Sequence, residues 1–160
     1  ETLGIQDPLP YIAIAKTYSR QGEFFVAARN VERAIEFDPT NADIYGQLGI
    51  VRFRSRNYEG SIPAFACALE GCTVFEDPIQ GIFIPEDSED MEDMAGMPTH
   101  IVAGMELNNN SVVYYYTYGS VLAALDQCDK AIDFLNQVES IYANDELIMG
   151  IVQESLFICS

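Results

Sequence analysis

The feature that most constrains the fold of this chain is an internal repeat with a period of 34 residues. Shifting the sequence by 34 positions, or by 70, superposes residues of similar size and polarity. The matched sets include Tyr11, Tyr45 and Tyr115, then Ala15, Gly49 and Gly119, then Ala27, Ser61 and Ala131. A unit of this length that recurs in phase is typical of a solenoid, in which neighbouring units share one continuous core.

Each copy contains two runs of apolar residues at helical spacing, joined by a short polar turn. The first copy predicts helices from about Leu9 to Ser19 and from about Phe24 to Phe37. Asp7 is the expected N-cap, with Pro8 at the first helical position and Gly22 in the turn. The small matched residues are expected where the paired helices cross, because larger side chains would separate the axes beyond ~8–10 Å.

The sequence therefore predicts an all-α solenoid in a single domain of residues 1–160. Three repeats and a capping helix make up the array, and a non-helical acidic insert interrupts it before the third repeat. The repeats span about residues 8–41, 42–75 and 112–145, the insert 76–111 and the capping helix 145–158.

The repeated pattern of aromatic, small, Gly-x-aromatic, Ala and Pro residues resembles the tetratricopeptide repeat family. The first copy matches it at Tyr11, Ile14, Ala15, Tyr18, Gly22, Phe24, Ala27, Val31, Ala34 and Pro39. The second copy departs from the pattern at Arg52 and Arg56, and the third has Asp126 and Cys128 in place of Gly-x-aromatic. At a finer level, the segments CALEGCTV, YYYTYGSVLAALDQCDKA and ESLFICS resemble a group of bacterial tetratricopeptide proteins of the cell envelope.

In this family the first helix of each repeat lines a concave face, which binds extended peptides or an amphipathic helix. The resemblance carries this role over to Leu9, Ile12, Lys16, Ser19, Asp43, Gly46, Ile50, Phe53, Val113, Tyr116, Ser120 and Ala123. Some relatives use a lysine and asparagine clamp for a chaperone's C-terminal carboxylate. Lys16 is the only base in this set and no asparagine joins it, so that ligand is not expected.

Residues 76–111 do not follow the repeat, and their prolines argue against a helix there. Two apolar runs, Ile79–Ile84 and His100–Leu107, predict a hairpin whose tip is the acidic run 86–93, with an irregular loop as the alternative. The acidic run has neither the alternate acids nor the central glycine of a helix–loop–helix calcium site, so calcium binding is not expected.

Charge is distributed unevenly along the chain. Residues 1–56 carry seven acidic and seven basic side chains, whereas residues 57–160 carry eighteen acids and one base, Lys130. The excess of negative charge argues against nucleic acid or an anionic membrane surface as partner; its simplest interpretation is a solvated surface. A basic patch is predicted from Arg20, Arg52, Arg54 and Arg56, with Lys16 beside it.

Two interpretations of the basic patch stay open. Its cations complement the dipoles of helix C-termini, or they receive an acidic segment. That segment would belong to a partner, to the insert or to a neighbouring copy, and the last case would give head-to-tail assembly.

The four cysteines favour two bridges, Cys67–Cys72 and Cys128–Cys159. Cys128 begins the second helix of the third copy and Cys159 ends the capping helix, so in antiparallel neighbours the two lie close together. Bridges predict a location outside the cytoplasm, and the resemblance to envelope proteins implies a bacterial cell envelope or secretion. Buried free thiols in the cytoplasm are the alternative, and the spacing does not fit zinc.

No catalytic constellation is evident. The single histidine, His100, lies in the insert, and no phosphate-binding loop, HExxH motif or cofactor motif is present. No run approaches the ~18 apolar residues of a membrane span. The expected function is a non-enzymatic scaffold that binds a protein or peptide through the concave face. A structural subunit is the alternative, either of an extracellular head-to-tail filament or accessory to a membrane complex.

Overall fold

The computed structural model of the chain describes residues 7–77, 81–83 and 99–160. Within these residues the chain is mostly helical, with seven helices and one small sheet. The helices are α1 (Leu9–Arg20), α2 (Phe24–Phe37), α3 (Ala42–Arg54), α4 (Tyr58–Glu70), α6 (Val112–Ala124), α7 (Cys128–Tyr142) and α8 (Glu146–Ile158). The helices predicted in the first copy and at the C-terminal end agree with α1, α2 and α8 to within one residue at each end.

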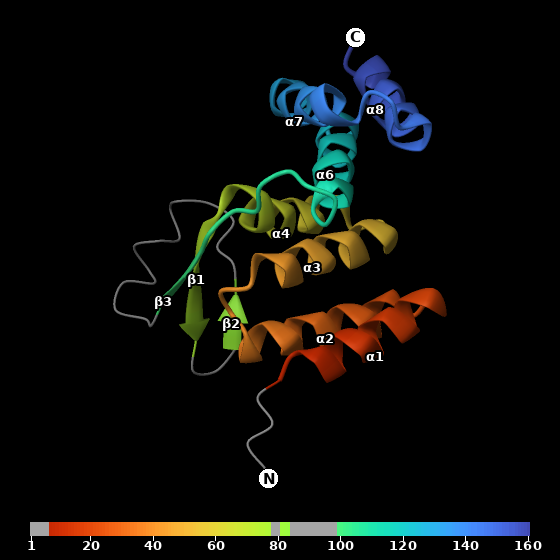
Figure 1. The fold of residues 1–160 in the computed structure, drawn as a ribbon. Coiled ribbons are helices and arrows are strands. Elements are labelled where there is room, and N and C mark those ends of the chain that lie inside the picture. Colours follow the sequence, from red (N-terminus) through yellow and green to blue (C-terminus); the bar gives the residue numbers. More distant parts are fainter. Residues whose placement is uncertain (1–6, 78–80, 84–98) are drawn as a thin grey trace.

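The helices pack as successive pairs, α1 with α2, α3 with α4 and α6 with α7. Each pair packs on the next through α2 on α3 and α4 on α6, and α8 closes the series against α6 and α7. Figure 1 shows the consequence, with α1 and α2 at one end of the molecule and α7 and α8 at the other. One apolar core runs through all of the pairs.

Side chains cap the starts of several helices. The side chain of Asn41 accepts a hydrogen bond from the Asp43 amide at the start of α3, and Asp145 accepts one from the Ile148 amide at the start of α8. The start of α1 differs from the prediction, because Pro8 is the N-cap and the helix begins at Leu9. Asp7 still contributes, since its Oδ1 accepts from the Leu9 amide at 3.0 Å.

Small residues lie at the helix crossings, as the repeat predicted. Ala27, Ser61 and Ala131 are fully buried. A Cβ on Gly49 would lie 2.6 Å from the Phe65 ring, and one on Gly119 would lie 2.7 Å from the Leu135 side chain. Phe65 and Leu135 are themselves matched by the 70-residue shift, so α3–α4 and α6–α7 repeat the same close contact.

The turn inside each helix pair also repeats. Gly22, Arg56 and Asp126, at matched positions, all have positive φ, of 80°, 68° and 61°. In each pair, the backbone amide of the residue after this position donates a hydrogen bond to the carbonyl five residues earlier. The bonds run from Glu23 to Tyr18, from Asn57 to Arg52 and from Gln127 to Leu122, at 2.9, 2.9 and 2.8 Å. The left-handed residue that ends a helix is therefore retained although only the first copy has glycine there.

The insert differs from the predicted hairpin. Three strands, β1 (Cys72–Asp77), β2 (Gly81–Phe83) and β3 (Thr99–Val102), form an antiparallel sheet in the order β2-β1-β3. The two predicted strands therefore do not pair with each other, since each pairs with an edge of β1. The second predicted repeat had included most of β1, but Gly71, with φ of 85°, turns the chain out of α4 one residue before the strand. The acidic run 86–93 lies outside the described residues.

The cysteines lie in the two pairs that the sequence favours. The sulfur atoms of Cys67 and Cys72, and of Cys128 and Cys159, are at disulfide distance, with Cα–Cα separations of 4.8 and 5.6 Å. The first bridge joins the last turn of α4 to the start of β1, and the second joins the start of α7 to the residue after α8. In the chain-entropy account, a bridge across 31 residues stabilises the fold by about 3–4 kcal/mol.

Candidate peptide-binding groove

A groove of about 780 Å³ runs across the first helices of the three helix pairs, α1, α3 and α6. The segment that precedes α6 and one residue of α2 complete it. Its lining residues are Ala15, Lys16, Ser19, Arg20, Val31, Asp43, Gln47, Ile50, Val51, Arg54, Met105, Asn110, Val113 and Tyr114. The volume falls within the ~300–1,000 Å³ of ligand-binding clefts.

One part of the groove is cationic, with Lys16 and Arg20 from α1 and Arg54 from α3. Arg54 is held in position, because its Nη1 donates to the Ser19 hydroxyl at 2.8 Å and its guanidinium lies 5.2 Å from the centroid of the Phe24 ring. Lys16 and Arg20 are exposed. Three cations on two adjacent helices can attract a carboxylate and pair with it.

A polar cluster stands where α3 meets α6. The Tyr114 hydroxyl donates to Asp43 Oδ1, and the Gln47 amide donates to Asp43 Oδ2, each at 2.7 Å. Burial, and then the hydrogen bond to Asp43, raise the pKa of Tyr114, so the phenol stays protonated and keeps donating. The carboxylate of Asp43 thus has its own donors, and the cluster joins α3 to α6.

Apolar side chains line the space between the cations and the polar cluster. Ala15, Val31 and Val51 are buried, while Ile50 and Val113 are partly accessible. A chain segment laid here would bury apolar side chains and keep its acidic groups beside Lys16, Arg20 and Arg54.

The structure gathers part of the predicted concave set. Lys16, Ser19, Ile50 and Val113 line the groove together, with Asp43. Gly46 is buried behind the Tyr114 ring. The remaining members, Leu9, Ile12, Phe53, Tyr116, Ser120 and Ala123, are not among the lining residues.

Each of these excluded residues has another environment, and Tyr116 is partly buried against the core. Leu9 is exposed on the first turn of α1, and Ile12 and Ala123 are buried in the core. The Phe53 ring lies 5.7 Å from that of Tyr58. The hydroxyls of Ser120 and Ser155 share a hydrogen bond of 2.7 Å, since α8 packs on α6 and covers that stretch of its surface.

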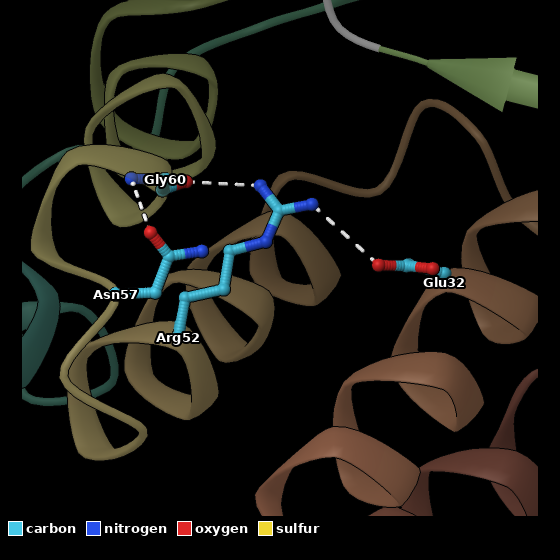
Figure 2. A network of polar contacts seen from close by, with 4 residues as sticks. All are labelled: Glu32, Arg52, Asn57 and Gly60. Carbon is cyan, nitrogen blue, oxygen red and sulfur yellow. Dashed lines mark hydrogen bonds and ion pairs between the residues drawn. The ribbon is translucent and has the colours of Figure 1, made fainter.

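The predicted basic patch does not form one surface. Figure 2 shows Arg52 turned toward Glu32 of α2 and Gly60 of α4. Its Nη1 donates to the Gly60 carbonyl at 2.9 Å and its Nη2 lies 3.5 Å from Glu32, while Asn57 accepts from the Gly60 amide. Arg56 occupies the exposed turn after α3. Alternate residues of a helix point to different sides, so only Arg54 and Arg20 of the four reach the groove.

Sequence reasoning missed several lining residues. Gln47 follows Asp43 by one helical turn, so the periodicity of α3 would have identified it. Tyr114 fills the space opposite Gly46, a contact between distant segments that no local pattern encodes. Met105 enters from the segment after β3, for which the repeat provides no template.

Other side chains that could take part in acid–base chemistry or metal binding lie apart from the groove. His100 Nε2 on β3 is 3.4 Å from the Glu76 carboxylate, on an exposed part of the sheet. In the part of the chain that the structure describes, no group of three or more His, Cys, Asp or Glu residues is placed to hold a metal ion. Across the same residues, no helix is long and apolar enough to cross a membrane.

Comparison of the chain with protein-family models found no match, and comparison with curated proteins found no significant similarity.

Proposed function

We propose that this protein is a tetratricopeptide-type scaffold that binds an extended, acidic segment of a protein partner in the groove between α1, α3 and α6. The sequence pattern supports the repeat assignment, and the recurring crossing and turn geometry of the helix pairs accords with it. The proposal rests on one observation above all: the groove combines an apolar lining with Lys16, Arg20 and Arg54.

The chemistry of the groove selects the partner. Lys16 and Arg20 are exposed and favour a carboxylate over a neutral or basic side chain. The apolar lining favours segments in which hydrophobic residues alternate with acids. An extended backbone can also accept or donate hydrogen bonds at Gln47 and Asn110 on the rim. This recognition is independent of any cofactor.

Phage-displayed random dodecapeptides provide a direct test. We expect selection on the wild-type protein to enrich peptides that combine Asp or Glu with aliphatic residues. By fluorescence anisotropy, the Lys16→Glu/Arg20→Glu variant should bind the selected peptides at least about 10-fold more weakly, which corresponds to about 1.4 kcal/mol.

The matched control is Arg29→Glu/Arg33→Glu, which makes the same change in charge at two exposed arginines of α2 away from the groove. Its affinity should stay within about 2-fold of wild type. Absence of enriched peptides, or equal weakening in both variants, would refute the groove as the binding site.

The two cysteine pairs support a location in an oxidising compartment, outside the cytoplasm. Intact-mass measurement of protein from its native source, before and after treatment with a thiol reductant, should show the gain of four hydrogen atoms, two for each bridge. Four free thiols before reduction would contradict this part of the proposal.

A further inference from the structure

The last helix, α8, presents apolar side chains to solvent as well as to the core. Leu147 is 85% exposed, Phe157 78% and Ile158 56%, whereas Val152 on the inner side is fully buried. Gly150 lies beside them, with open space where a Cβ would be. A helix that is apolar on all sides is normally covered on all sides, so this outer surface of α8 indicates a contact with another protein surface.

The surroundings of this surface are acidic. Glu146 and Glu154 lie on α8, and Asp133 and Glu139 lie on the adjacent α7. Lys130 is the one base of these two helices, and its ammonium is 2.7 Å from Glu70 of α4. A complementary partner must therefore offer apolar side chains surrounded by cations.

The first helix pair of the chain itself offers such a surface. Phe25 on α2 is 76% exposed, and the Arg29 guanidinium lies 5.7 Å from the centroid of its ring. Ile14 and Tyr18 on α1 are also exposed, and Arg33 follows Arg29 by one turn of α2. Arg29 and Arg33 are both exposed, and Arg33 also lies 3.6 Å from Glu36, so two cations accompany Phe25 on this side of α2.

The two surfaces stand at opposite ends of the molecule (Figure 1), so one copy cannot join them within itself. We infer that the outer surface of α8 docks on the α1–α2 surface of a second copy of the chain. Such a contact pairs two different surfaces, so it is head-to-tail and leaves a free surface at each end for the next copy. This assembly does not require the peptide groove.

Two single variants test the inference. Phe25→Glu blocks the α1–α2 surface and Leu147→Glu blocks the α8 surface, and both replace highly exposed side chains, which protects the fold. By sedimentation velocity from about 1 to 500 µM in low salt, wild type should form a concentration-dependent series of oligomers, and each variant alone should stay monomeric.

An equimolar mixture of the two variants is the decisive sample. Phe25→Glu retains a functional α8 surface and Leu147→Glu a functional α1–α2 surface, so the mixture should form a one-to-one dimer and stop there. Ile101→Glu, the same change in an isoleucine that is 75% exposed on β3, should assemble like wild type.

A wild-type protein that is monomeric to about 500 µM, a mixture that stays monomeric, or an equal effect of Ile101→Glu would overturn the inference. Circular dichroism confirms that each variant keeps its helix content. Leu147→Glu, which lies outside the groove, should still bind the selected peptides like wild type, so assembly and peptide binding can fail separately.

Discussion

At the scale of single residues, Gly49 and Gly119 set the distance between paired helices. Each faces a large buried side chain, Phe65 or Leu135, that lies closer than a Cβ would tolerate. Phe65 and Leu135, which would have to move to make room for a Cβ, are both fully buried, so removing the clash would cost packing free energy. The helices meet because the glycines leave room for the partner side chain.

Gly49→Ala and Gly119→Ala are therefore expected to destabilise the protein. Alanine gains up to about 1 kcal/mol of helix propensity, whereas overpacking costs about 1–3 kcal/mol. We expect a net loss of about 1–2 kcal/mol in the free energy of unfolding for each variant, measured by urea denaturation.

Gly150→Ala is the matched control, because it makes the same change within a helix where the Cβ meets no atom within 4 Å. It should gain about 0.5–1 kcal/mol. If Gly49→Ala were as stabilising as Gly150→Ala, the close crossing would not exist in solution.

The candidate site could be predicted in part from single residues. The family resemblance placed Lys16, Ser19, Ile50 and Val113 on one face, and all four line the groove, because residues on one side of successive first helices align. It failed for Ser120, since α8 packs on α6 and Ser155 of α8 bonds the Ser120 hydroxyl. A repeat pattern describes each unit alone and does not say where the array is closed.

At the scale of elements, the turn between paired helices is the most faithfully repeated feature. A left-handed residue costs a non-glycine side chain roughly 1 kcal/mol or more, and aspartate tolerates it better than arginine does. Arg56 and Asp126 occupy this conformation where the first copy has Gly22.

Arg56→Gly should accordingly raise the free energy of unfolding by about 0.5–1 kcal/mol, and Asp126→Gly should raise it by less. Gln21→Gly is the control. Gln21 directly precedes Gly22 and has a φ of −86°, so glycine relieves no backbone strain there. It should lose stability in the same urea titration. A loss in Arg56→Gly would contradict the left-handed turn.

The sheet shows what the sequence could not provide. β-branched and aromatic residues marked strands on both sides of the acidic run, but strand pairing joins distant segments and depends on which edges are free. β1 offers two edges, so β2 takes one through a short connection and β3 takes the other. The repeat had assigned Cys72 to Phe75 to the second unit, which concealed the central strand.

At the scale of the whole molecule, the repeat predicted successive pairs of helices, and the bounds it predicted for the first pair agree with α1 and α2 to within one residue. The repeat could not predict which polar side chains of different helices bond to one another. The Tyr118 hydroxyl, for example, donates to Glu70 at 3.0 Å while Lys130 bonds the same carboxylate, a network that spans α4, α6 and α7.

This network predicts alkaline sensitivity. Burial raises the pKa of Tyr118 to about 12, against the opposing hydrogen bond with Lys130. The unfolded phenol ionises near pH ~10, so above that pH the unfolded state holds fewer protons than the folded state. The contribution of Tyr118 to stability should be constant below about pH 10 and fall by about 1–2 kcal/mol as the pH rises to about 12.

Urea midpoints measured across this range test the expectation, with ionisation followed by absorbance at 295 nm. Tyr118→Phe should flatten the decline, although Tyr45 and Tyr114, whose pKa values burial also raises, retain part of it. A decline that is equally steep in Tyr118→Phe would exclude Tyr118 as its cause.

The bridge from Cys128 to Cys159 has a mechanical consequence. A load applied at Ser160 reaches Cys159 and crosses through the sulfur atoms directly to Cys128, so the peptide of α7 and α8 carries none of it. About 110 Å of chain is thereby withheld from extension, at ~3.5 Å for each of the 31 steps. Under tension the C-terminal end would transmit force without extending the segment of its last two helices.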